Sequence, residues 1–458
     1  MDDGRTAALV TSAERSPGLP TLLAYSGPAV PLAMVLLPLM AYLPPFYARE
    51  VGLGLSGIGV VFLVARTWDA ISDPVLGALS DRTRHRWGRR KPWIAAGAPL
   101  LMVSLYFLCV PPGEVGLGYL FVWILLTYLA WTMVQIPYLS WGAELSRDYA
   151  ARTRITGFRE VGSIIGILAA STLPLAFLGA GTDDLGAVLR VLALALVALI
   201  PVTVIVALAV APSASLEGAP PRGWVRLVRA AGSNTPLMRV LGSVLVYRTA
   251  WSMFDAAFVF FVGDFLGFPL SFLILIVVQY VSSIAAAPLV VRLANRFGKH
   301  VVLAGALAGG AVFLLYAAFF MPRGELWPIL LVWPVLGVLN APLWLLPTAI
   351  VADTIDYGVF RSGDESSGLY MAGFNLAQKL ALALGVGLAL PLLDLSGFDP
   401  AGDNGASAAA GLQMVAAVLP AALLMIAIIP LWRFPLTRAR HDLLRRWLAR
   451  SARIESSV

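Results

Sequence analysis

Residues 66–92 read RTWDAISDPVLGALSDRTRHRWGRRKP. The first half of this stretch belongs to an apolar segment, about residues 57–80, that is long enough to cross a bilayer as a helix, which takes about 20 residues. Asp69 and Asp73 nevertheless lie near the middle of that segment. A charge there costs from about 2.5 to more than about 10 kcal/mol, and it is normally tolerated only where it faces water, a counter-charge or an ion. The stretch therefore predicts a membrane helix whose two carboxylates have a functional role.

The two aspartates are four residues apart, which places both carboxylates on one helical face, about 6 Å apart along the axis. Like charges in this arrangement repel, and one carboxylate would keep its proton unless a cation lay between them. The second half of the stretch is a short basic loop, and such a density of Lys and Arg marks the cytoplasmic side of a membrane. The basic residues of this loop are Arg82, Arg84, Arg86, Arg89, Arg90 and Lys91.

The composition of the 458-residue chain also indicates a polytopic membrane protein. Hydrophobic residues make up 59% of it and charged residues only 13%, whereas soluble domains average about 25% charged residues. The net charge of +7 resides in loops and tails, so positive-inside topology explains it and no nucleic-acid partner is predicted. We expect no enzyme activity, because the three histidines, His85, His300 and His441, lie in loops or the tail and no nucleophile–base set is evident.

Apolar length predicts an all-α integral membrane protein with about 12 transmembrane helices in two six-helix halves and both termini cytoplasmic. A faint internal repeat supports the two halves: LSDRTRHRWGRRKP follows the second span and LANRFGKHVV follows the eighth. This is the architecture of the major facilitator superfamily. The predicted parts are an N-terminal cytoplasmic tail (1–26), the N-terminal half (27–210), a cytoplasmic linker (211–236), the C-terminal half (237–432) and a basic cytoplasmic tail (433–458).

Two motifs carry a resemblance to a known family. RTWDAISDP followed by DRTRHRWGRRKPW, and VADTIDYGVFRSGDESSGLY at residues 351–370, resemble the glycoside–pentoside–hexuronide:cation symporters, the melibiose permease group. The resemblance implies that Asp69 and Asp73 bind the coupling cation with Thr132 and the neighbouring Ser72. It also implies that Lys379 pairs with the carboxylates. No cofactor other than this cation, Na⁺ or H⁺, is expected.

The resemblance implies a substrate pocket that contains Arg159 and Trp344, and we expect Gln135, Asn375 and Lys379 near them. Melibiose permease holds sugar hydroxyls with two aspartates, and here the matching positions are Ala33 and Gln135. The cation site therefore matches the family while the galactoside site does not, and the sequence leaves the identity of the substrate open. A further set of rim charges could form a cytoplasmic gate by pairing across the two halves: Glu144, Arg154, Asp353 and Asp356.

Each of these assignments has a structural alternative. Asp69, Asp73 and Lys379 could be an ion-pair triad that only holds helices together. Arg248 and Asp255, seven residues apart on one helical face, could be a buried pair or a substrate contact. Membrane-protein tryptophans often lie in interfacial belts, which is the alternative for Trp344.

These observations predict a secondary active transporter of the cell inner membrane, a multi-pass protein that couples a Na⁺ or H⁺ gradient to symport of a glycoside or related small solute. The expected partners are membrane lipids and the solute, and a monomer is expected. One alternative is a cation-coupled carrier of a lysophospholipid-like or other amphipathic substrate. A second is a non-transporting sensor or scaffold with a transporter fold.

Overall fold

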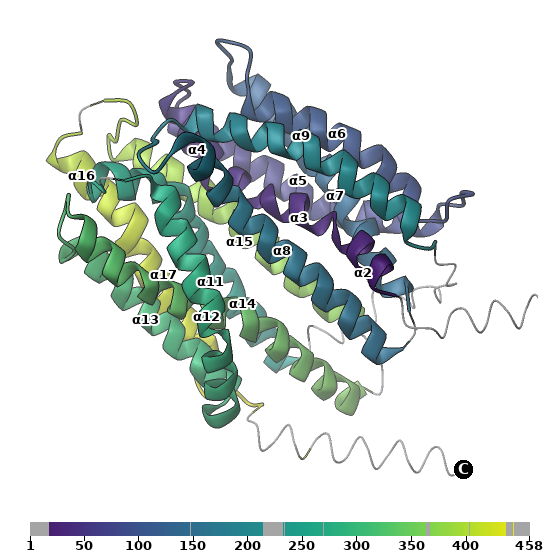
Figure 1. Cartoon of the computed structure of the whole chain (residues 1–458). Helices are drawn as coiled ribbons and strands as arrows, with labels where there is room; N and C mark the ends of the chain where they lie inside the picture. Colours follow the sequence, from purple (N-terminus) through teal and green to yellow (C-terminus); the bar gives the residue numbers. More distant parts are fainter. Residues whose placement is uncertain are drawn as a thin grey trace, which may run out of the picture. The chain divides into compact units, whose positions relative to one another are not determined.

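The structure is a computed structural model that describes residues 18–146, 148–213, 232, 234–268, 270–362, 367–402, 404–436 and 443. Every regular element in these residues is a helix, and 12 helical stretches are long and apolar enough to cross a membrane. The chain divides into two compact units, Met1–Gly218 and Ala219–Val458, drawn in Figure 1. The division falls within the predicted linker 211–236, most of which lies outside the described residues.

The first unit has six of these spans. Its first span, Leu19–Arg49, consists of short elements interrupted at prolines: α2 (Leu19–Ser26), α3 (Ala29–Met34), the π-helix η1 (Pro38–Tyr42) and α4 (Leu43–Arg49). The other five helices of this unit are α5 (Leu55–Arg82), α6 (Lys91–Cys109), α7 (Leu117–Glu144), α8 (Tyr149–Leu178) and α9 (Leu185–Val210).

The first helical stretch begins at Leu19, eight residues before the predicted boundary at residue 27. Pro20 lies in the first turn of α2, where a missing N–H costs nothing and the fixed φ suits the helix. Leu22 and Tyr25 of this helix are each 1% exposed, so this turn is part of the packed core rather than of a tail. Gly27 and Pro28 interrupt the apolar run at this point, which is why the sequence pattern places the start too late.

The second unit has the other six spans. They begin with α11 (Thr235–Phe260), which continues as the π-helix η2 (Phe261–Phe265), and α12 (Phe272–Phe297). The next three are α13 (Lys299–Phe319), α14 (Leu326–Ser362) and α15 (Ser367–Leu395). The last span is formed by α16 (Ala406–Gln413), η3 (Met414–Val418), α17 (Leu419–Ile428) and the short 3₁₀ helix η4 (Ile429–Leu431). The predicted basic tail beyond residue 436 lies outside the described residues, apart from Leu443.

The internal repeat corresponds to a repeated turn. Gly88, between α5 and α6, has φ 89°, and Gly298, between α12 and α13, has φ 97°. These left-handed values favour glycine, because other residues have a Cβ that clashes there. Each glycine is followed at once by a basic residue, Arg89 or Lys299. The two halves thus share a turn geometry as well as a sequence pattern.

Candidate functional site

The two predicted cation-binding carboxylates lie on α5 and share a partner on α7. The Thr132 hydroxyl oxygen lies 2.9 Å from Asp69 Oδ1 and 3.1 Å from Asp73 Oδ1. Thr132 is fully buried and Asp69 is 3% exposed. The arrangement follows from the four-residue spacing, which aligns both side chains on the face of α5 that packs on α7. Three oxygens from two helices therefore converge inside the first unit.

This donor set suits a hard monovalent cation or a proton. Carboxylate and hydroxyl oxygens are the ligands that hard cations prefer. Within the described part of the chain, no three or more His, Cys, Asp or Glu side chains are grouped so that they could hold a metal ion. Thr132 also has only one hydroxyl proton, so it donates to one carboxylate at a time. The chemistry of the site thus fits a small cation that interacts with both carboxylates.

Ser72 and Pro74 flank Asp73 and have different roles. The Ser72 hydroxyl donates to the backbone carbonyl of Asp69 at 3.1 Å, so the structure directs this predicted ligand to its own helix rather than to a carboxylate. Pro74 has no N–H and lies inside α5, so the carbonyl of Ala70, one turn earlier, loses its usual helical donor. The helix therefore lacks one backbone hydrogen bond beside the carboxylates.

Arg66 belongs to the same face of α5 and was missed in the sequence analysis. Its side chain is 5% exposed, its guanidinium lies 4.9 Å from the centroid of the Tyr128 ring on α7, and its Nε has no hydrogen-bond partner in the described structure. Arg66, Asp69 and Asp73 follow an i, i+3, i+7 spacing, which is the signal that could have found it. The positively charged Arg66 side chain, held over an aromatic face, thus lies one helical turn from the carboxylates.

The predicted substrate residues of the first unit lie on α7 and α8. Arg159 forms an ion pair with its neighbour Glu160 and also interacts with the hydroxyl of Tyr25. Gln135, three residues after Thr132, has a buried side-chain carbonyl oxygen without a partner in the described structure. Such an acceptor is costly unless a donor reaches it, which agrees with a role in binding a hydroxyl or amino group.

Ala33, which the resemblance matches to an aspartate of melibiose permease, lies where α3 and α8 approach closely. Ala33 on α3 is 6% exposed, and a Cβ built on Gly166 of α8 would come within 3.0 Å of the Ala33 Cβ. The two helices therefore approach too closely at this point for a side chain at position 166.

In the second unit, Trp344 lies on α14 near the middle of the span Leu326–Gly358. This depth argues against the interfacial-belt alternative. Trp344 is 51% exposed, and the Arg248 guanidinium of α11 lies 4.1 Å from the centroid of its ring. Asn375 and Lys379 lie four residues apart on α15, so they share a face. Asn375 is exposed and Lys379 is partly buried.

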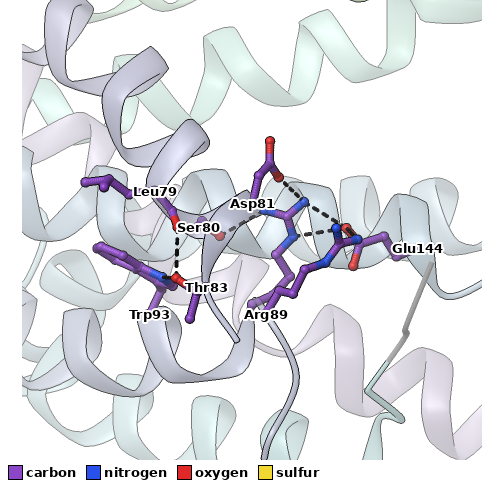
Figure 2. Close-up of polar contacts among 8 residues, drawn as sticks. Leu79, Ser80, Asp81, Thr83, Arg89, Trp93 and Glu144 are labelled. Atoms are coloured by element: carbon purple, nitrogen blue, oxygen red, sulfur yellow. Dashed lines mark hydrogen bonds and ion pairs between the residues drawn. The ribbon is translucent and has the colours of Figure 1, made fainter. Parts of the chain in front are cut away.

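The predicted gate residue Glu144 is part of an ionic network within its own half (Figure 2). Its Oε1 accepts from Arg90 at 2.8 Å and from Arg89 at 3.1 Å. Arg90 also lies 2.5 Å from Asp81 Oδ1 and donates to the Ser80 hydroxyl at 2.9 Å. The network joins the ends of α5 and α7 to the basic loop.

The other half has a corresponding ion pair. Lys299, which follows the repeated glycine turn, lies 2.7 Å from Asp353 Oδ2 on α14. Glu144 ends the fourth span of its half and Asp353 lies in the fourth span of the other, so the pairs occupy equivalent places. Arg154 is exposed and has no ion pair within the described residues, and Asp356 is partly buried. The pairing of these residues across the halves stays a prediction.

Comparisons with known proteins agree with this architecture. The inner membrane symporter YicJ of Escherichia coli (strain K12) is 28% identical over 79% of this chain and 79% of its own length. The glucuronide carrier protein homolog of the same organism is 27% identical over 86% of this chain and 88% of its own. A crystal structure of the nucleoside transporter NupG has a TM-score of 0.62 at 14% identity, covering 91% of this chain and 100% of that one, which supports the fold.

The family comparison decides the class of protein. Residues 24–438 match the family described as MFS/sugar transport protein. The resemblance to glycoside–pentoside–hexuronide:cation symporters is thereby confirmed, as is the expectation of a multi-pass membrane transporter rather than an enzyme. The chain belongs to the MFS/sugar transport protein family.

Proposed function

We propose that this protein is a cation-coupled symporter that uses a Na⁺ or H⁺ gradient to accumulate a glycoside or a related small solute. The observation that carries the proposal is the convergence of Asp69, Asp73 and Thr132 oxygens inside the membrane-spanning part of the first unit. Intramembrane carboxylates are costly and are generally retained for function. The names of two relatives, an inner membrane symporter and a glucuronide carrier homolog, support the same class.

Charge arithmetic explains how a cation would act at this site. Asp69 and Asp73 carry two negative charges on one helical face when both are ionised, and the Thr132 hydroxyl lies within hydrogen-bond distance of both. A Na⁺ ion or a proton would relieve the remaining repulsion. We assign Lys379 the role of counter-charge for this pair when the cation is absent, as the family resemblance implies.

Coupling then follows from linkage. If the cation binds one transport conformation better than the other, it shifts the population towards that conformation. A substrate that prefers the same conformation must then bind more tightly when the cation is bound, by the same factor by which it raises the affinity for the cation. Coupling free energies of about 1–3 kcal/mol give changes in affinity of about 5- to 150-fold. We assign the substrate contacts to Arg159, Gln135, Trp344 and Asn375.

Reconstituted vesicles test the proposal. Uptake of a panel of radiolabelled glycosides is measured with and without an imposed Na⁺ or H⁺ gradient, for the wild type and for the Asp69→Asn and Asp73→Asn variants. The wild type should accumulate at least one solute only with a gradient. Both variants should lose accumulation and still exchange substrate down its own gradient, because asparagine keeps the shape and removes the charge. Unchanged gradient-driven accumulation in both variants would show that the aspartates are structural.

A further inference from the structure

A cavity of about 420 Å³ opens at one end of the second unit, between the start of α11 and the end of the last span. We call it the Arg239 groove, and its lining residues are Arg239, Met425, Ile428, Ile429, Pro430 and Trp432. The volume lies within the range of about 300–1,000 Å³ that is usual for small-molecule sites. None of these residues belongs to the candidate cation or substrate site, so the groove is a separate feature of the molecule.

Two hydrogen bonds hold the walls of the groove together. At Pro430, which has no N–H to continue a helix, the last span passes from α17 into the short 3₁₀ helix η4. Arg433 follows with a φ of 52°, and its carbonyl oxygen accepts from the Arg239 guanidinium at 3.3 Å. One turn further along α11, the buried Ser243 hydroxyl donates to the Ala427 carbonyl oxygen at 2.8 Å. The groove is therefore built between two tied segments.

Arg239 is the only charged residue among the described residues that line the groove. It is partly buried, and no carboxylate in the described part of the chain forms a salt bridge with it. Its bond to Arg433 uses one of the five N–H donors of a guanidinium. The remaining donors suit the oxygens of a phosphate group, which a planar guanidinium can hold in pairs. The groove thus has a positive charge that an oxyanion would match.

The rest of the lining is apolar and open to the surroundings. Met425, Ile429 and Trp432 are 51%, 69% and 70% exposed. Met425 and Ile429 lie in the span Ala406–Leu431, and Trp432 follows it directly. Tryptophan is typical of the level of the lipid headgroups, and Arg239 lies near the start of its own span, Thr235–Phe265. One end of the groove therefore lies at the level of the headgroups, and its apolar wall extends into the span beside it.

The charge of the neighbouring chain segments argues against a segment of this protein as the occupant. The predicted cytoplasmic linker precedes α11 and the basic tail follows Trp432, and like charges would repel both from Arg239. The inner leaflet is negatively charged instead, and basic pockets between membrane helices on the cytoplasmic side bind anionic headgroups. The arginines of the two segments are Arg222, Arg226 and Arg229 in the linker, and Arg438, Arg440, Arg445, Arg446 and Arg450 in the tail.

We propose that the Arg239 groove binds an anionic phospholipid of the cytoplasmic leaflet, with its phosphate group on the Arg239 guanidinium and an acyl chain along Met425 and Ile429. The lipid contacts both α11 and the last span, so its binding stabilises the second unit. The assignment does not depend on the coupling cation or on the transported solute. The competing explanation is a generally positive rim, in which every arginine at this end attracts anionic lipid equally.

The charge of the site is tested with three probes. Native mass spectrometry of the purified full-length protein gives the dissociation constant of each bound lipid. Phosphatidylglycerol is the anionic probe, phosphatidylcholine with the same acyl chains is the zwitterionic probe, and glycerol 3-phosphate offers the phosphate without acyl chains. The variants are Arg239→Gln and Arg239→Lys. Arg296→Gln is the matched control, because Arg296 is an exposed arginine in the last turn of α12, 5.2 Å from the centroid of the Phe297 ring, and does not line the groove.

The apolar wall is tested by filling it. Ile429→Trp places a large ring in the groove. Ile426→Trp places the same ring at a position of the same span that is 49% exposed but does not line the groove. Melting temperatures in detergent without added lipid show whether each variant is folded. Melting temperatures with added phosphatidylglycerol show whether the lipid stabilises it.

The wild type should bind phosphatidylglycerol more tightly than phosphatidylcholine. Arg239→Gln should weaken phosphatidylglycerol binding by about 10- to 100-fold, the factor expected for a charge-assisted hydrogen bond, and should abolish the stabilisation by this lipid. Arg239→Lys should restore part of the affinity, because lysine binds phosphate as a point charge without the planar fork. Ile429→Trp should also weaken binding. Arg296→Gln and Ile426→Trp should bind as the wild type does.

Equal binding of the two phospholipids by the wild type, or an equal loss in Arg239→Gln and Arg296→Gln, would overturn the proposal in favour of a positive rim. Binding of glycerol 3-phosphate as tight as that of phosphatidylglycerol would show a site for free phosphate and overturn the assignment to a lipid. Unchanged phosphatidylglycerol binding in Ile429→Trp would do the same for the acyl chain. If Arg239→Gln does not fold, the comparison of Ile429→Trp with Ile426→Trp decides, since equal binding by these two variants contradicts the proposal.

Discussion

The Thr132 hydroxyl of α7 lies 2.9 Å from Asp69 Oδ1 of α5, although the two residues are 63 positions apart in sequence. The same oxygen lies 3.1 Å from Asp73 Oδ1. A single hydroxyl thus connects two helices and two carboxylates in a buried place. Its oxygen lone pairs can also contribute to binding a cation, so the contact bears on helix packing and on the proposed cation coupling.

Replacing Thr132 by valine should weaken the response to the coupling cation. Valine has nearly the same shape but no hydroxyl, and losing a hydrogen bond to a charged group costs about 1.5–3 kcal/mol. We expect the cation concentration for half-maximal uptake to rise by about tenfold or more. Thr132→Ser, which keeps the hydroxyl, is the matched control and should stay close to the wild type. An unaltered cation dependence in the valine variant would exclude Thr132 from the cation site.

The spans and the alignment of the two carboxylates could be predicted, because both follow from local pattern. Apolar length identifies membrane helices, and the four-residue spacing places Asp69 and Asp73 on one face. The apolar pattern is a poor guide at prolines and glycines. At Gly27 the apolar run is interrupted, although the residues before it still pack into the core. The first helix starts at Leu19 because tertiary contacts bury Leu22 and Tyr25.

Side-chain partners were harder to predict than helices. Arg66 repeats the spacing of the aspartates, but sequence alone does not show that Tyr128 lies beneath it. The contact between Arg248 and Trp344 joins α11 to α14, and no local pattern connects those helices. The resemblance led to Thr132, which lies beside both carboxylates. It also led to Ser72, whose hydroxyl instead bonds to its own helix.

The orientation in the membrane can be tested by cysteine labelling. Cys109 is the chain's only cysteine and is 1% exposed, so background reaction should be low. Arg86 and Glu114 are exposed and flank the two ends of α6. We expect Arg86→Cys to react with an impermeant maleimide only from the cytoplasmic side and Glu114→Cys only from outside, because basic loops stay inside. The reverse labelling would contradict the predicted topology.

The close approach of α3 and α8 makes a prediction about two glycines on one helix. A Cβ at Gly166 would overlap the Val30 carbonyl oxygen, whereas one at Gly157 would meet nothing within 4 Å. Gly166→Ala should therefore destabilise the protein by about 1–3 kcal/mol, as overpacking does. Gly157→Ala should be neutral or stabilising by up to about 1 kcal/mol through helix propensity. Melting temperatures in detergent compare the two, and equal values would show that the helices can separate without cost.

The two equivalent ion pairs should differ in their contribution to stability. The side chains of Arg90 and Glu144 are 8% and 12% exposed, whereas those of Lys299 and Asp353 are 37% and 20% exposed. Arg90 also contacts Asp81 and Ser80, so its removal disturbs more groups. Breaking a buried pair by removing one partner costs about 3–5 kcal/mol, whereas exposed pairs contribute about 0–1 kcal/mol.

We therefore expect Arg90→Met to lower the melting temperature clearly more than Lys299→Met does. The cost of Arg90→Met should approach the lower end of the buried range, about 3 kcal/mol, because Arg89 still contacts Glu144 in that variant. The cost of Lys299→Met should be about 1 kcal/mol. Both variants replace a cation with an unbranched apolar side chain, so each serves as the control for the other. If Lys299→Met proved as damaging as Arg90→Met, burial would not be what sets the strength of these pairs.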